Sequence, residues 1–202
     1  MVTYKTDFTL GDDFYFREET PKTQILLMDT HNRDMKHFDE WLIKNPKGYK
    51  KTTPFTISVG GDVFKHYDPS YYSEIFRIKE IDSKIIPISL ENMGYLTYSK
   101  KKNGFINWRG DIYETEEDLY IKNWREQLFW APYTEKQYES LMSLSIELCE
   151  QFHIERRVAD HNTHMDFAEA FQGVLYKSNY SKYCRDINPS MKIDKINLKR
   201  EL

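Results

Sequence analysis

The chain has 202 residues, of which 40% are hydrophobic and 30% charged, which is enough for one substantial core and short for two domains. The 15 Tyr, 12 Phe and 4 Trp, with only 8 Gly and 7 Pro, exclude collagen-like, low-complexity and disordered chains, because such a chain has much apolar surface to bury. Lys and Arg number 29 against 32 Asp and Glu, and a net charge of −3 lacks the basic excess of a nucleic-acid-binding protein.

Cysteine content and hydropathy indicate whether the protein has disulfides, a signal peptide or a membrane span. Two cysteines, Cys149 and Cys184, are too few for a disulfide framework. Residues 1–17 lack a basic head and an apolar run, and no window approaches the roughly 18 apolar residues of a membrane span. We therefore expect a monomer that is made in the cytoplasm without a signal peptide, does not insert into a membrane and does not bind nucleic acid.

The first third of the chain predicts a strand, a helix and a hairpin. Gln24–Met28 is a short apolar run that reads as a buried strand, and the polar residues Asp29–Asn32 follow it. Asn32 is a suitable N-cap for a helix that stops by Pro46. Its apolar positions fall at spacings of three and four: Met35, Phe38, Trp41 and Leu42. Two β-type stretches then flank a Gly-Gly-Asp turn at 60–62, which indicates a hairpin.

The segment Ile85–Asn92 alternates apolar and polar residues. Ile86, Ile88 and Leu90 are predicted to take the core face, which leaves Glu91 on a face free for polar chemistry. Pro87 within this run suggests the start of the strand or an edge position.

The remaining chain predicts an irregular insertion, a long helix and one more strand. Residues 93–133 carry turn signals and many aromatic residues. Thr134 to Gln137 matches a capping box, so a helix is expected from there to about Phe152. Its apolar stripe consists of Leu141, Leu144, Leu148 and Phe152. Val158-Ala159 is interpreted as a last short strand before a polar loop, and residues 178–190 as a loop.

Strands and helices mix throughout, which indicates an α/β or α+β fold. The fold class predicted is α/β, with a mixed central sheet flanked by helices in a single domain, 1–202. Within it we expect an N-terminal extension (1–21), the insertion (95–132) and a C-terminal tail (191–202).

Polar residues gather directly after the predicted strands. Asp29–Asn32, Glu91-Asn92 and Asp160–His164 each follow such a strand, and Cys184–Asp186 lies further on. Loops at strand ends converge on one rim of a sheet, and His, Asp and Cys are the ligand types that zinc takes.

Five motifs follow one another along the chain: Thr23–Leu27, Phe55–Val63, Ile86–Gly94, Trp130–Gln137 and Val158–Asn162. In this order they resemble the zinc-dependent N-acetylmuramoyl-L-alanine amidases, the type shared with bacteriophage endolysins and peptidoglycan recognition proteins. The likeness runs from about Lys22 to Pro189. It implies a mixed sheet with helices on both sides, one zinc ion at the rim, and cleavage of the amide between the muramic acid lactyl group and L-alanine.

The resemblance also implies roles for single residues. His161 matches the family's histidine after the penultimate core strand, a zinc ligand. Glu91 matches a glutamate that takes a proton from the metal-bound water, which would make it the catalytic base. Asn92, Trp108 and Arg185 are the candidates for binding the glycan or peptide stem of peptidoglycan.

Two ligand positions depart from the family pattern. The first ligand is usually a histidine, and strict register places Met28 there, so Asp29 or His31 would supply the contact. The third ligand is either Asp186, with Cys184 ahead of it, or Asn188, with Asp186 in the place of the family's lysine.

Three hypotheses follow from the resemblance. The first is a zinc amidase that degrades the cell wall, a hydrolase of the phage lysin type. The second is a catalytically degenerate module of the same fold that only binds peptidoglycan. The third is a structural protein that has lost both functions.

Overall fold

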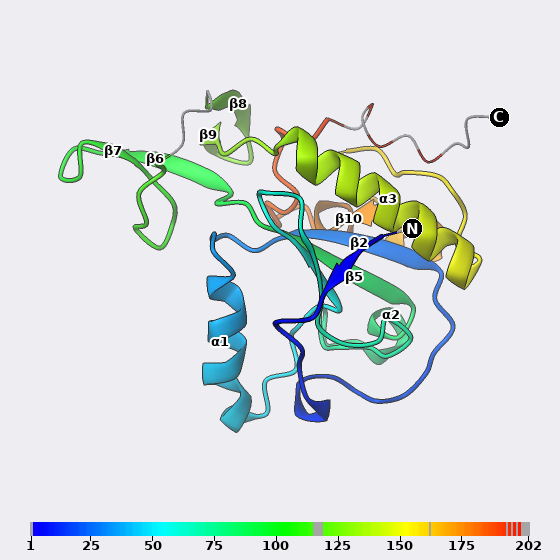
Figure 1. The fold of residues 1–202 in the computed structure, drawn as a ribbon. Coiled ribbons are helices and arrows are strands. Elements are labelled where there is room, and N and C mark those ends of the chain that lie inside the picture. Colours follow the sequence, from blue (N-terminus) through cyan, green and yellow to red (C-terminus); the bar gives the residue numbers. More distant parts are fainter. Residues whose placement is uncertain are drawn as a thin grey trace.

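A six-stranded sheet forms the centre of the molecule (Figure 1). The computed structural model describes residues 2–114, 119–161, 163–192, 194, 196 and 198. The strand order is β1 (Tyr4–Lys5), β4 (Val63–Lys65), β3 (Phe55–Ile57), β5 (Ile85–Leu90), β2 (Gln24–Asp29) and β10 (Gly173–Tyr176). Neighbouring strands are parallel except β3 and β4, which form the predicted hairpin. This mixed sheet with its helices confirms the predicted α/β class.

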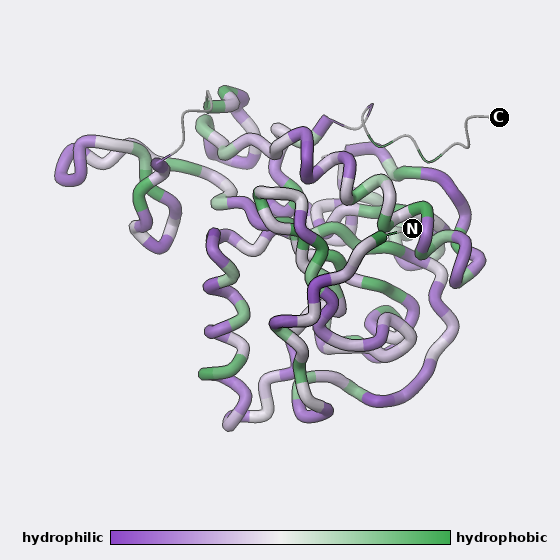
Figure 2. Tube along the Cα trace, in the orientation of Figure 1, coloured by the Kyte–Doolittle hydropathy of each residue, from purple (hydrophilic) through white to green (hydrophobic). Residues whose placement is uncertain are grey.

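The two middle strands, β2 and β5, are buried on both faces. All six residues of each strand are buried, and Figure 2 shows apolar residues along them. Ile25 and Leu27 pack into the core that also contains the long helix, whereas Leu26 and Met28 pack into a second core on the opposite face. An uninterrupted apolar run is what such a doubly covered strand requires.

The expectation that one face of β5 is open to polar chemistry is wrong. Ile86, Ile88 and Leu90 do share the predicted core face. The other face is covered as well, by irregular segments that contribute Ile75 and others to the second core. Ser89 on that face is only 4% exposed.

Pro87 lies inside this central strand, so the prediction of a strand start or an edge position is also wrong. The Glu91 amide donates to Ile57 O on β3, and amides alternate in direction along a strand, so the Pro87 nitrogen faces the β3 side. The β3 ladder begins only opposite Ile88. Because Pro87 lies beyond that ladder, its missing N–H leaves no strand hydrogen bond unmade.

Helix α3 (Glu135–Phe152) covers one face of the sheet and begins as predicted. The Thr134 hydroxyl accepts the Gln137 amide, and the Gln137 side chain accepts the Thr134 amide, which confirms the capping box. Leu141, Leu144 and Leu148 are buried against the sheet. In the described part of the chain, no helix is long and apolar enough to cross a membrane.

Helix α1 (Lys36–Lys44) starts later than the sequence suggests. Its N-cap is Met35, and Asn32 does not cap it. His31, Asp34 and Met35 have left-handed backbone conformations, so the chain turns through this segment before the helix begins. Leu42, expected on the apolar face, is 45% exposed. The helix packs against the N-terminal segment and the β3–β4 hairpin (Figure 1).

Short helical segments connect the other elements. They are η1 (Asp12–Phe14), η2 (Asn45–Lys47), α2 (Lys79–Asp82), η3 (Ala168–Ala170) and α4 (Lys177–Tyr180). The region 178–190, expected as a loop, therefore begins inside a helical turn.

The last strand of the sheet is β10, which the sequence interpretation missed. Val158, expected in that strand, makes only an isolated bridge to Val174. Gly173 adopts φ +132°, and a Cβ there would lie 2.4 Å from Arg157 O, so only glycine fits this start of the strand. In the sequence, Gly173 resembles the end of an element. In the structure it is the first residue of the strand that pairs with β2.

The insertion is more regular than expected. Its strands β6 (Tyr95–Ser99), β7 (Gly104–Ile106), β8 (Tyr120–Trp124) and β9 (Gln127–Trp130) form a second, antiparallel sheet in the order β7-β6-β9-β8 (Figure 1). Residues 115–118 of the predicted insertion lie outside the described residues. Met93, Leu96 and Ala131 give this second sheet a small core of its own.

Candidate functional site

The carboxyl ends of three parallel strands meet at one edge of the central sheet. Asp29 is the last residue of β2, Glu91 follows β5 and Lys177 follows β10. Asp186 joins them from the C-terminal segment. This edge is where parallel sheets usually carry their sites.

Three charged side chains form what we call the ion cluster: His31, Lys177 and Asp186. His31 Nε2 lies 2.7 Å from Asp186 Oδ1, and Lys177 Nζ donates to Asp186 Oδ2 at 2.9 Å. Asp186 is 3% exposed, whereas its two partners are partly exposed.

The charges in the ion cluster stabilise one another. Burial alone raises the pKa of Asp186, but the charges of Lys177 and His31 outweigh it and hold that pKa below its usual value. Burial lowers the pKa of His31 and of Lys177, and the Asp186 charge raises both above their ordinary values. One carboxylate therefore faces the Lys177 ammonium and an imidazole whose protonated form it favours.

Asp29 lies beside the ion cluster and is completely buried. The Tyr133 hydroxyl donates to Asp29 Oδ1, and the Asn188 amide lies 3.3 Å from Oδ2. Burial raises the pKa of Asp29, and the nearby Asp186 charge raises it further. This carboxyl therefore tends to keep its proton, in contrast to Asp186.

The position of His31 depends on Gly94. His31 itself has φ 58°, and Asn107 Nδ2 holds its carbonyl at 3.2 Å. A Cβ on Gly94, which has φ +73°, would lie 2.7 Å from His31 Nδ1. Glycine is therefore required for the imidazole to reach Asp186.

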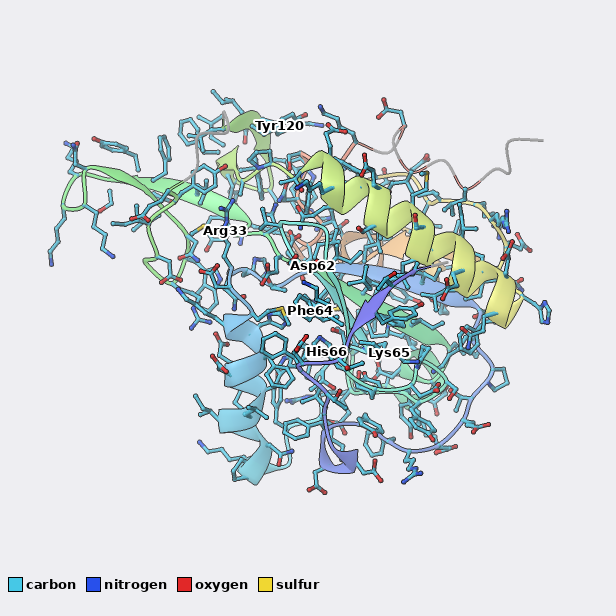
Figure 3. All side chains as sticks on the ribbon, viewed as in Figure 1. Arg33, Asp62, Phe64, Lys65, His66 and Tyr120 are labelled. Atoms are coloured by element: carbon cyan, nitrogen blue, oxygen red, sulfur yellow. The ribbon has the colours of Figure 1, made fainter. Side chains whose placement is uncertain are left out.

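A cavity of about 170 Å³ opens beside the ion cluster. It is lined by residues that include Asp29, His31, His37, Trp41, Lys51, Lys177 and Asp186. His37 in its wall is joined to a buried chain of hydrogen bonds through Thr56 to His66, on the face of the hairpin that α1 covers (Figure 3).

This chain determines which nitrogens carry hydrogen. His66 Nδ1 donates to the Phe8 carbonyl at 2.6 Å, so its Nε2 must accept from the Thr56 hydroxyl at 2.9 Å. The Thr56 oxygen then accepts from His37 Nε2 at 2.9 Å, which leaves His37 Nδ1 as a bare acceptor. That buried atom has no hydrogen-bond partner in the described part of the chain. Burial lowers the pKa of His37 to about 3 and of His66 to about 4, so both are neutral at pH 7.

Glu91, expected as the catalytic base, is buried and bonded to backbone amides. It is 4% exposed and accepts the Met35 amide at 2.6 Å and the Val59 amide at 3.3 Å. Burial raises the pKa of Glu91. The carboxylate thus ties the start of α1 to the hairpin.

His161 does not join the ion cluster. Its ring packs on Tyr176, with centroids 4.8 Å apart, and faces the backbone of Ile187 and Asn188, which raises its pKa. Burial is the main cause that lowers the pKa of His161 to about 4. Lys177, and not His161, directly follows β10, the strand beside β2.

The expected substrate-binding residues occupy three different environments. Asn92 is buried and bridges the Pro132 carbonyl and Asn188. Trp108 is 58% exposed on the insertion. Arg185 donates to the Arg125 carbonyl at 3.1 Å. Of these, only Trp108 has a broad free surface.

The donor set at this edge does not fit a zinc ion. A catalytic zinc needs about three deprotonated ligands within roughly 2.0–2.3 Å. Among the described residues, no group of three His, Cys, Asp or Glu side chains has that geometry. Both Asp186 oxygens hold cationic groups, and the Lys177 ammonium would repel a second cation. Zinc therefore stays a prediction that this arrangement does not favour.

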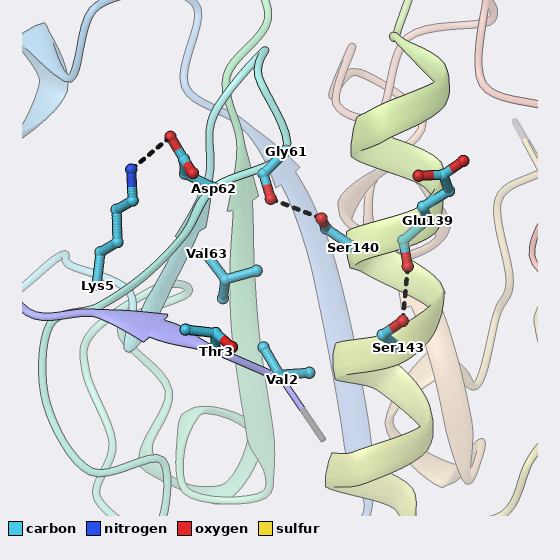
Figure 4. Close-up of a pocket in the computed structure, with 9 residues that line it drawn as sticks. All are labelled: Val2, Thr3, Lys5, Gly61, Asp62, Val63, Glu139, Ser140 and Ser143. Atoms are coloured by element: carbon cyan, nitrogen blue, oxygen red, sulfur yellow. Dashed lines mark hydrogen bonds and ion pairs between the residues drawn. The ribbon is translucent and has the colours of Figure 1, made fainter.

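Other hollows lie elsewhere among the described residues. One, of about 360 Å³, lies between β1, the hairpin and α3 (Figure 4), and its polar groups are paired within the protein: Lys5 with Asp62, and Ser140 with the Gly61 carbonyl. The other, of about 450 Å³, lies between the turn before α1 and the second sheet. It is lined by residues that include Arg33, Lys36, Met93, Asp111 and Glu114.

The sequence interpretation missed Lys177, Tyr133 and His37 as parts of this edge. Lys177 carried the only usable signal, since it follows the apolar run Gly173–Tyr176. Tyr133 and His37 resemble ordinary core residues, and only the fold brings them to the cavity.

Comparison with known proteins shows the fold. No protein-family model and no curated protein sequence matches the chain. Among solved structures, the N-acetylmuramoyl-L-alanine amidase LysC from Clostridium intestinale URNW is similar at 13% identity and a TM-score of 0.52, over 96% of this chain and 91% of that one. The endolysin amidase LysCS from the same organism is 11% identical with a TM-score of 0.54, over 97% of this chain and 92% of that one. A mutant endolysin from Bacillus subtilis is 12% identical with a TM-score of 0.50, over 92% of this chain and 89% of that one. The chain therefore has the fold of these amidases.

Proposed function

We propose that this protein binds peptidoglycan without zinc-dependent cleavage. The observation that carries the proposal is the Lys177 ammonium, 2.9 Å from Asp186 at the end of the strand beside β2. The resemblance to zinc amidases implies a metal at this edge, whereas here a lysine supplies the positive charge. A lysine ammonium neutralises a carboxylate but cannot activate water as a metal does.

The hollow of about 450 Å³ next to the site offers the means of binding. Arg33 extends from the turn before α1 toward the second sheet (Figure 3), and its Nε is buried without a hydrogen-bond partner among the described residues. Acidic and basic residues line the same hollow, so it can pair with both the amides and the carboxylates of a peptide stem. The exposed Trp108 on the insertion provides a flat surface for a sugar ring.

The zinc amidase is the second candidate. It is favoured by the convergence of Asp29, His31 and Asp186, three of the four expected ligands, at one edge. A phage-type lysin that acts on the wall would require a rearrangement that frees Asp186 from Lys177.

The test combines metal analysis, binding and turnover on purified protein. We expect zinc far below one ion per chain, co-sedimentation with purified cell-wall sacculi that a chelator does not change, and no release of amino groups from them. Arg33→Glu should weaken co-sedimentation by about tenfold or more, while Lys101→Glu, in the exposed turn between β6 and β7, should leave it unchanged.

The outcomes separate the candidates. One zinc per chain together with chelator-sensitive amino-group release would replace the binding module by the amidase. Absence of co-sedimentation with sacculi of several wall types would overturn both.

A further inference from the structure

A second cavity adjoins the one beside the ion cluster, at the C-terminal end of α1. It has a volume of about 160 Å³ and shares Lys44, Tyr49 and Lys51 with its neighbour. Since a water molecule occupies roughly 30 Å³ of liquid, this cavity has room for one small anion and some water. We call it the basic pocket.

The basic pocket is lined by five cationic side chains, Lys44, Lys47, Lys50, Lys51 and Arg77, and by one acid, Glu74. Two of the cations are already engaged. Lys50 donates to the carbonyls of Asp13 and Tyr15, each at 2.9 Å. Lys44 lies 3.7 Å from Glu40 and over the Tyr49 ring.

The other three cations have no hydrogen-bonded or ion-paired partner among the described residues. Lys47, Lys51 and Arg77 make no side-chain hydrogen bond or ion pair within the described part of the chain. Lys51 is half-buried, and burial lowers its pKa. The charges of Lys177 and Arg77 lower this pKa further, whereas the Asp186 charge raises it.

We infer that the basic pocket binds a phosphate group, either free phosphate or a phosphomonoester. The five cations that line the pocket outnumber its single carboxylate, and a phosphate monoester carries close to two negative charges at pH 7. The Arg77 guanidinium can donate two parallel hydrogen bonds to phosphate oxygens, and the lysines act as point charges. A single carboxylate would neutralise less of this positive charge than a phosphate. This site is independent of peptidoglycan binding.

The experiment is a calorimetric titration at pH 7 in a buffer without multivalent anions, with inorganic phosphate, glycerol 3-phosphate and acetate as probes at equal ionic strength. We expect one saturable site for phosphate and no saturable binding of acetate. Glycerol 3-phosphate binding as tightly as phosphate indicates a phosphomonoester, and weaker binding indicates free phosphate.

Charge reversal locates the site. Lys51→Glu and Arg77→Glu should each weaken phosphate binding by about tenfold or more, Lys51→Arg should retain it, and the distant Lys101→Glu should not change it. Arg77 is exposed, so Arg77→Glu keeps the test open if Lys51→Glu fails to fold. No saturable phosphate binding, equal binding of acetate, or full binding by both reversed variants would each overturn the inference.

Discussion

A carboxylate next to a strand end takes its role from what surrounds it, and Glu91 is an example. Its two oxygens accept amides from the start of α1 and from the hairpin. A buried acceptor of this kind holds chain segments together because each amide would otherwise lack a partner. A catalytic role for Glu91 stays a prediction, while its contacts indicate a structural one.

Glu91→Ala is expected to lower the free energy of unfolding by about 2 kcal/mol or more, because two buried amides lose their acceptor. Urea denaturation measures this change. Glu139→Ala, at an exposed position of α3, is the matched control and should change the free energy of unfolding by less than about 0.5 kcal/mol. Equal values for the two variants would show that the Glu91 contacts do not stabilise the fold.

At the scale of elements, α3 and β5 differ in how much of their structure is local. The capping box that starts α3 lies within four residues and the apolar stripe repeats along one helix, so the sequence pattern identifies both. The burial of β5 on both faces depends on distant segments such as Ile75 and Ala159, which no pattern within the strand reports.

Two substitutions test α3. Thr134→Ala should lower the free energy of unfolding by about 1 kcal/mol through loss of the cap, and Leu144→Ala by about 2–5 kcal/mol through a cavity in the core. Thermal or urea unfolding provides the comparison, with the exposed Ser143→Ala as the control. A Leu144→Ala protein as stable as the control would contradict the packing of this face on the sheet.

At the scale of the whole molecule, the ion cluster joins three segments that are far apart in sequence: the turn after β2, the start of α4 and the C-terminal segment. The second sheet closes over the same turn, since Asn107 holds the His31 carbonyl. The cluster is therefore a tertiary junction as well as a candidate site.

Lys177→Met should destabilise the protein by about 3–5 kcal/mol at pH 7, because it removes one of the two cations that face the buried Asp186 charge. The double variant Lys177→Met with Asp186→Asn should recover part of this loss, since the buried charge is then gone. Urea unfolding measures both, and Lys182→Met, exposed and close by in sequence, is the control. A single variant as stable as this control would mean that the ion pair does not support the fold.

The sequence by itself determined the elements whose signals are local: the buried β2 run, the hairpin at 60–62, the α3 cap and the α/β class. Only the tertiary structure decided the chemistry at the sheet edge. Asp29 and His31 were identified from their positions after a strand and Asp186 from the family resemblance, but the position of Lys177 beside Asp186 depends on β10. The physical reason is range: caps and periodicity act over a few residues, whereas burial, pKa and ion pairing depend on contacts such as that of Glu91 with Met35, 56 residues apart.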